Sequence, residues 1–318
     1  MKIFSRIWVR YLLAFLIITF VFYFMGRQLY YGWDELSQYH FEFKYKMFLL
    51  SFVPLTINFL ITSVYFQRLL KVLGVSVNLT NTFKVIFLSR LGRYIPGGGV
   101  WIFVGQVYLF DKEKVSKLIV LIANIMLLLI YTLYGLLVFI AFYLFYPDSK
   151  LAIPKVALIF ICFVCIIILH PKIFSKVVNL ISFKLKGEKI KISYNYSDLI
   201  YLTVLCIVDW LIFGVGLYFL INSFYSVSIN LIPIFAGTFA ISWILGLYIF
   251  ITPDGLGIRE GVQSYLLSFF LPLPIAIIFS LMTRLWSTIG DLISSGLALL
   301  IKVTQDENLK VKIVKTMK

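Results

Sequence analysis

Charged residues that interrupt the most apolar parts of this chain are its first candidates for chemistry. The segment ITPDGLGIREG, residues 251–261, places Asp254, Arg259 and Glu260 between two long apolar runs. A charged side chain at membrane depth costs at least about 2.5–3.5 kcal/mol, so such residues usually line a polar path or pair with a partner. We therefore interpret these three residues as parts of a polar site inside an apolar protein.

Three arginines at such interruptions indicate a ligand that carries phosphate. Arg93 follows one apolar run, Arg259 lies in the segment above, and Arg284 lies within a later run. A guanidinium group binds two phosphate oxygens in a planar fork, and a helix N-terminus, such as the one expected at Ile258, also favours an anion. The sequence therefore predicts Arg93, Arg259 and Arg284 as ligands of a phosphate group.

Four acidic residues accompany these arginines, and we predict that they act as counter-ions or proton carriers. Asp254 and Glu260 flank Arg259, and Asp209 lies in the middle of an apolar run. Asp291 follows Arg284 by seven residues, which places both on one face of a helix. Asp209 has a second interpretation, in which it serves only as the ion-pair partner of Arg284.

Two simpler interpretations of the basic residues remain open. Arg90 and Arg93 lie near a predicted helix end and would serve equally as interfacial anchors. Arg259 and Glu260 would serve equally as a structural ion pair that holds an irregular segment together.

The composition assigns the chain to the polytopic membrane proteins. Of its 318 residues, 61% are hydrophobic and only 14% are charged, and the mean hydropathy is +0.98. Soluble domains are about half apolar and a quarter charged. The net charge of +15 comes from basic residues in short segments between apolar runs, a pattern that fits loops beside an anionic leaflet and argues against a nucleic-acid partner.

Six apolar stretches are long enough to span a bilayer as helices, since a span needs about 20 residues. They cover residues 9–30, 47–66, 118–146, 152–170, 198–222 and 274–301. We expect an all-α membrane domain over residues 1–301, followed by a basic tail over 302–318.

Two further apolar stretches, 79–110 and 231–271, are broken in the middle. The first is interrupted at 96–99 by the sequence PGGG and the second at 253–255 by PDG. Proline removes a backbone donor and glycine favours non-helical dihedral angles, so each interruption ends a helix. We predict two re-entrant helix pairs whose tips meet inside the membrane.

The distribution of lysine and arginine predicts that both termini lie in the cytoplasm, because the segment 171–191 and the tail are basic whereas 147–151 carries an acidic residue. One broken stretch then enters from each side of the membrane. The chain reads as an inverted repeat of roughly 47–146 and 198–301, with a site expected where the breaks face each other.

Metal and cofactor chemistry has little support. Cys162 and Cys165 form a C-x-x-C within an apolar run, Cys206 is isolated in another, and the two histidines, His40 and His170, are far apart. We expect neither a metal nor a cofactor.

Two motifs resemble the flippase-like family, which includes the membrane half of lysylphosphatidylglycerol synthases and stand-alone flippase-like domain proteins of bacteria and archaea. The residues that carry the resemblance, and that we predict to bind substrate, are Arg93, Tyr94, Pro96, Gly97 and Gly98, then Pro253, Gly255, Gly257 and Arg259, and finally Arg284. The sequence departs from the family at Asp254, where a small residue is expected. The tail is also too short for the soluble aminoacyl-transfer domain of the synthases.

The resemblance implies translocation, across the cytoplasmic membrane, of a phosphate-bearing lipid such as an aminoacyl-phospholipid or a polyprenyl-linked glycolipid. Two alternatives remain: a membrane-embedded enzyme that modifies lipids, with Glu260 or Asp209 as its base, and a subunit that delivers lipid to a separate transferase.

The predicted orientation can be tested by cysteine labelling in intact cells. Gly187→Cys lies in the basic segment and should react only after the cytoplasm is made accessible, whereas Ser149→Cys should react with an impermeant thiol reagent from outside. The unaltered chain, whose cysteines lie in apolar runs, is the control. Labelling of Gly187→Cys from outside would contradict both the orientation and the repeat.

Overall fold

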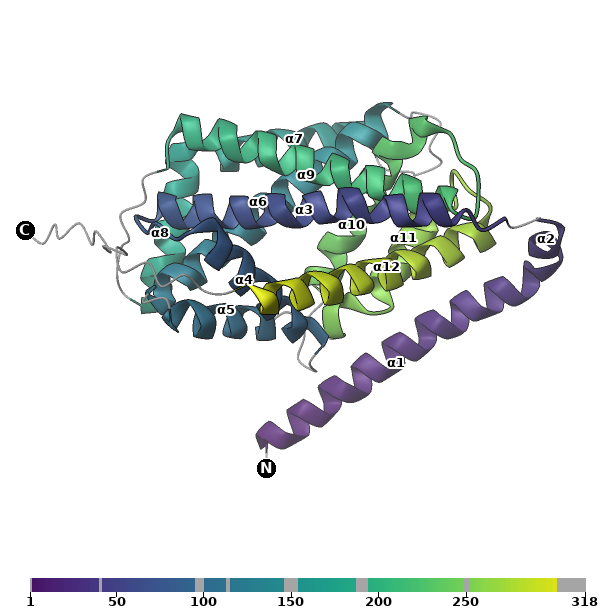
Figure 1. Ribbon diagram of the computed structural model, residues 1–318, viewed down its shortest axis with the longest axis horizontal. Coiled ribbons are helices and arrows are strands. Elements are labelled where there is room, and N and C mark those ends of the chain that lie inside the picture. Colours follow the sequence, from purple (N-terminus) through teal and green to yellow (C-terminus); the bar gives the residue numbers. More distant parts are fainter. Residues whose placement is uncertain are drawn as a thin grey trace, which may run out of the picture.

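The computed structural model describes residues 2–39, 42–94, 100–112, 115–145, 154–186, 194–248 and 252–301 (Figure 1). These parts of the chain contain helices and no strand. The protein is therefore an all-α polytopic membrane protein, as its composition predicts.

The helices fall into long apolar rods and short segments at the breaks. In chain order they are α1 (Lys2–Tyr31), α2 (Trp33–Gln38), α3 (Tyr45–Val72), α4 (Leu79–Arg90), η1 (Leu91–Tyr94), α5 (Val100–Lys112), α6 (Lys117–Phe145), α7 (Lys155–Leu169), α8 (Pro171–Lys186), α9 (Tyr196–Asn222), η2 (Ile229–Leu231), α10 (Ile232–Tyr248), η3 (Pro253–Gly255), α11 (Ile258–Leu267) and α12 (Leu273–Leu300).

Five helices are long and apolar enough to cross a membrane: α3, α6, α9, α12, and α10 together with η2. The first four match predicted spans. The predicted span 9–30 lies within α1, but the apolar helix found there, Phe15–Tyr31, is shorter than a crossing. The segment Ile229–Tyr248 is long enough to cross the membrane completely. Its length therefore does not distinguish a full crossing by α10 from a re-entrant helix. The re-entrant pairs therefore stay a prediction.

The predicted span 152–170 and the basic loop after it need correction. The chain bends by 76° between α7 and α8, and α8 makes most of the predicted loop helical. Pro171 stands at the bend, and the residue before a proline is disfavoured in the α conformation. α7 and α8 together form one bent apolar unit instead of a straight span and a loop.

The two breaks lie against each other, as the sequence predicts. η1 continues α4 and η3 precedes α11, and these two short segments are in contact. Pro96, Gly97 and Gly98 lie outside the described residues, so the predictions made for them are not addressed by the structure. On the described side, the first break places Arg93 and Tyr94 against the second.

The contacts between helices follow the same pattern in the two halves of the predicted repeat, α3–α6 and α9–α12. α3 packs along α9 in the opposite direction, since the Lys44 amide donates to the Ser223 carbonyl at 2.7 Å at one end and Arg68 pairs with Asp198 at 2.6 Å at the other. α4 contacts α3 and α12, and α10 correspondingly contacts α9 and α6. The two broken stretches thus begin at opposite ends of the α3–α9 pair (Figure 1).

Glycine allows the second break to approach α10 closely. Asp254, Gly255 and Gly257 have φ values of 47°, 67° and 84°, in the left-handed region that glycine adopts without strain. A Cβ on Gly255 would lie 2.6 Å from the Cα of Gly246. Backbone meets backbone at this point, so neither glycine has room for a side chain.

We expect Gly255→Ala to destabilise the protein, because the new methyl group meets main chain and the residue is held at positive φ. Strain of this kind costs about 1–3 kcal/mol. The measurement is the apparent unfolding temperature in detergent. Gly296→Ala in α12 is the matched control, since a Cβ there meets nothing within 4 Å. Equal unfolding temperatures for the two variants would contradict the close packing of the break.

Candidate functional site

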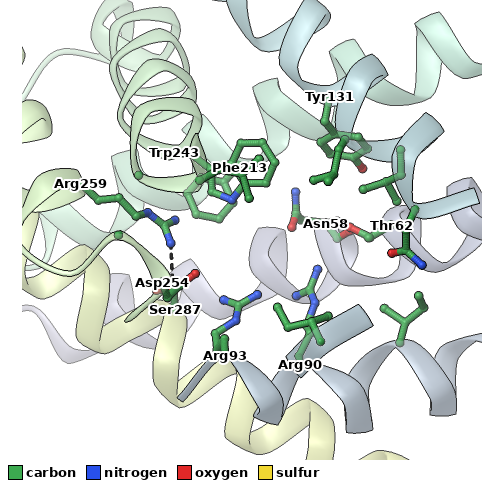
Figure 2. A pocket seen from close by; sticks show the side chains of 18 of the residues that line it. Asn58, Thr62, Arg90, Arg93, Tyr131, Phe213, Trp243, Asp254, Arg259 and Ser287 are labelled. Carbon is green, nitrogen blue, oxygen red and sulfur yellow. Dashed lines mark hydrogen bonds and ion pairs between the residues drawn. The ribbon is translucent and has the colours of Figure 1, made fainter. Parts of the chain in front are cut away.

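A cavity of about 240 Å³ lies where the two breaks meet (Figure 2). Its lining comes from α3, α4, η1, α5 and α6 and from α9, α10, η3, α11 and α12, so both halves of the repeat contribute to it. The polar and charged side chains of the lining are Asn58, Thr62, Arg90, Arg93, Gln106, Asn124, Tyr131, Asp209, Thr252, Asp254, Arg259 and Ser287. Apolar and aromatic side chains supply the rest of the wall.

The first break supplies two arginines that share one carboxylate. Asp291 of α12 pairs with Arg90 at 3.2 Å and with Arg93 at 2.8 Å, and the Tyr94 hydroxyl donates to it at 3.3 Å. The Asp291 side chain is 2% exposed. Because both arginines point inward to a buried partner, their interpretation as interfacial anchors is wrong.

The second break holds another ion-pair cluster. Asp254 pairs with Arg259 at 3.0 Å and with Arg284 at 3.4 Å, and Arg284 also donates to the main-chain carbonyl of Asp254 at 3.1 Å. Figure 2 shows Arg259 and Asp254 joined at the edge of the cavity. Asp254 thus pairs with two of the predicted phosphate ligands.

The ion pair between Arg259 and Glu260, the alternative interpretation of these two residues, does not form. Glu260 pairs instead with Arg284 at 3.1 Å, and its other oxygen accepts a hydrogen bond from the Gly257 amide at 2.6 Å. That second contact caps the first turn of α11. The N-terminus of α11 is therefore already neutralised by its own carboxylate, which weakens the expectation that it binds the ligand.

Helix α12 connects the two clusters, because Arg284 contacts the second break and Asp291 contacts the first. Four guanidinium groups and three carboxylates make up the combined network, namely Arg90, Arg93, Arg259 and Arg284 with Asp254, Glu260 and Asp291. The network carries one excess positive charge. A ligand with a single negative charge would balance it.

Asp209 of α9 is separate from this network. One interpretation of the sequence pairs it with Arg284, but one of its carboxylate oxygens accepts a hydrogen bond from the Tyr131 hydroxyl at 2.9 Å instead. Its other oxygen has no hydrogen-bond partner, and none of the ion pairs among the described residues involves it. Asp209 is 3% exposed and lines the cavity.

The predicted site residues therefore differ in their place relative to the cavity. Those that line the cavity are Arg93, Asp209, Asp254, Gly255 and Arg259. Arg284 and Asp291 pair with lining residues from behind, and they are in turn bonded to Glu260 and Tyr94, respectively. Pro253 and Gly257 shape the second break. Pro96, Gly97 and Gly98 lie outside the described residues.

Sequence reasoning missed several polar residues of the lining. Asn58 of α3, Asn124 of α6 and Gln106 of α5 all line the cavity, as does Tyr131. The sequence does contain a signal for the three amides. A side-chain amide within an apolar span faces protein or a wet cavity for the same reason as a charged group does.

No protein-family model matches the chain, and a search of curated proteins found no match. Among the residues that the structure describes, no three His, Cys, Asp or Glu side chains form a group that could hold a metal ion. The class that fold and site define is a multi-pass helical membrane protein with an arginine-lined cavity between two broken helix pairs.

A double-mutant cycle distinguishes the observed pairing of Arg259 from the predicted one. We expect Arg259→Gln and Asp254→Asn to show a coupling free energy of about 0.5–3 kcal/mol, as residues in direct contact do. Arg259→Gln and Glu260→Gln should couple less, because Glu260 contacts Arg284 instead. Unfolding by SDS titration in mixed micelles provides the free energies. A larger coupling with Glu260 would contradict the observed pairing.

Proposed function

We propose that this protein translocates a phosphate-bearing lipid across the cytoplasmic membrane, in the manner of the flippase-like family that its motifs resemble. The observation that carries the proposal is the inward orientation of Arg90, Arg93 and Arg259 into one cavity, between two helix pairs that enter from opposite ends of the bundle.

The charge of the site supports a phosphate ligand. The three cavity arginines are largely buried: the exposed fraction of the side chain is 15% for Arg90, 18% for Arg93 and 12% for Arg259. All three line the cavity, so each guanidinium group is available to a ligand there. An ion pair strengthens as the surrounding dielectric falls, and the guanidinium fork matches phosphate oxygens. The single excess positive charge of the network favours a phosphodiester, which carries one negative charge, over a dianionic phosphomonoester.

The size of the cavity supports a lipid whose headgroup alone enters the protein. A pocket for a drug-sized ligand measures about 300–1,000 Å³, and this cavity of about 240 Å³ is smaller. A phosphate with a short substituent fits that volume, whereas two acyl chains do not. The acyl chains would stay among the surrounding lipids while the headgroup passes through the polar site.

The inverted relation of the two halves supports movement between leaflets. In transporters built from inverted repeats, the substrate site lies between broken helices near the bilayer midplane, and one half rocks against the other. Here the two broken stretches begin at opposite ends of the bundle and meet at the cavity. A headgroup bound between them would be exposed to one side or the other as the halves move.

Leaflet exchange in liposomes tests the proposal. Purified protein is reconstituted with a trace of lipid that carries a fluorophore on an acyl chain, and dithionite added outside bleaches only the outer leaflet. We expect exchange of phosphodiester lipids above the rate in protein-free liposomes. Exchange no faster than in those liposomes, for every phosphate lipid in a panel of different headgroups, would overturn the proposed function.

We expect Arg259→Lys to slow exchange by about tenfold, the effect of losing about 1.4 kcal/mol, because a point charge does not reproduce the planar fork. Arg68→Lys is the matched control. Arg68 also pairs with a buried carboxylate, Asp198 at 2.6 Å, but does not line the cavity. If both variants slow exchange equally, Arg259 acts through folding and not through the ligand.

A further inference from the structure

We propose that α8 lies along the surface of the membrane and binds anionic phospholipid headgroups through its exposed lysines. Its partner is one leaflet of a bilayer that contains lipids with a net negative charge. This surface is outside the cavity between the two breaks, because the described residues that line that cavity come from other helices. The inference therefore stands separately from the proposed function.

The sequences of α7 and α8 differ in charge. Between Val156 and Leu169, α7 has no charged residue, whereas α8, PKIFSKVVNLISFKLK, has four lysines and no acidic residue. Charged residues are rare inside the hydrocarbon core, and four unpaired lysines within 16 residues do not suit that position. α7 therefore suits the apolar interior of the membrane, and α8 suits its polar surface.

The direction of the chain changes at the same point as its charge. The chain bends by 76° between α7 and α8, and α7 packs against α6, which is long enough to cross a membrane. Figure 1 places α8 at the end of the bundle where α3 ends and α9 begins. A basic helix that turns so sharply at the end of an apolar helix runs along the membrane surface instead of across the bilayer.

Contacts with residues at the start of α9 fix α8 in this position. At the bend, Nε2 of His170 and the Tyr196 hydroxyl share a hydrogen bond of 2.9 Å. Phe174 is fully buried, and its ring centroid lies 5.1 Å from that of Tyr194. Val178, one turn further along, is also buried. One face of α8 is thus held against the bundle, and the opposite face is directed outward.

The outward face of α8 carries both lysines and large apolar side chains. At about 100° per residue, its exposed side chains fall within roughly a third of the helix circumference. Those that the structure describes are Lys172, Lys176 and Lys184, together with Ile173, Leu180 and Phe183. None of the ion pairs among the described residues involves a lysine of α8.

An anionic lipid surface satisfies both kinds of side chain on this face. Ile173, Leu180 and Phe183 would enter the boundary between headgroups and acyl chains, while the lysine stems extend along it and place their ammonium groups at the phosphates. Hydrocarbon alone would leave the lysines unpaired, and water alone would leave the apolar side chains exposed. Each lysine beside an anionic leaflet strengthens binding by about fivefold, so the face favours lipids with a net negative charge.

Photo-crosslinking from α8 tests the inference on the full chain. A p-benzoylphenylalanine replaces Phe183, and the purified protein is reconstituted in liposomes with equal amounts of phosphatidylserine and phosphatidylcholine that have the same acyl chains. Mass spectrometry gives the ratio of the two lipid adducts. We expect phosphatidylserine adducts to exceed phosphatidylcholine adducts by at least about fivefold, and this excess to fall as the salt concentration rises. The same probe at Phe160, which is exposed in the uncharged part of α7, is the matched control and should give nearly equal adducts.

Lys172→Gln with Lys176→Gln should lower the adduct ratio at position 183 by at least about threefold, because two charges leave the face. Lys172→Arg with Lys176→Arg should keep the ratio, since the charge is retained. Lys44→Gln with Lys46→Gln is the matched charge control. This pair removes the same net charge at the other end of α3, so the ratio should stay that of the unaltered lysines.

Each other outcome contradicts the inference. Equal adducts of the two lipids at position 183, or no lipid adduct there, would overturn the anionic-lipid surface. An adduct with a second copy of the chain, or with another protein in intact cells, in place of lipid would show that α8 is a protein-binding surface. An unchanged ratio after Lys172→Gln with Lys176→Gln would show that these lysines do not hold the headgroups. None of these results measures leaflet exchange, so the proposed function is tested independently.

Discussion

The neutralisation of buried charge between α12 and the two breaks is the interaction on which the rest of this structure depends. Asp291 holds both arginines of the first break, and Arg284 holds Asp254 and Glu260 of the second. Removing one partner of a buried ion pair costs about 3–5 kcal/mol, since the remaining charge is left without compensation. Neither break can therefore move away from α12 unless its charged side chains find another partner.

Irregular backbone in an apolar bundle needs the same protection as charge, and here the two requirements are met together. The second break turns through positive φ at Asp254, Gly255 and Gly257, and Glu260 accepts the Gly257 amide that opens α11. Non-helical backbone at membrane depth is tolerated only inside protein or beside a wet cavity. On one side the second break is packed against protein, through the close contact between Gly255 and Gly246. On the other side it lines the polar cavity.

How far the sequence predicts this protein depends on the range of the interactions involved. The long apolar helices and both breaks could be predicted, because hydropathy, proline and glycine act locally. Partners across the bundle could not: Asp209 bonds to Tyr131 of α6 instead of Arg284, a choice that depends on how α6, α9 and α12 pack. The sequence alone argues against an ion pair between Arg259 and Glu260. Consecutive residues of a helix point about 100° apart, so their side chains do not face each other.

Under the proposed function, ligand binding and movement are coupled through these same ion pairs. Every cavity arginine already has a carboxylate partner, so a phosphate group that binds in a fork competes with Asp291 or Asp254 for the same guanidinium group. It therefore binds most tightly to a conformation in which an arginine has left its partner, and a ligand shifts an equilibrium by its differential affinity for the two states. Since Asp291 and Arg284 stand on one helix, release at one break changes how α12 is held at the other. The phosphate would thus weaken the contacts that fix both breaks, at the point where the two halves of the protein meet.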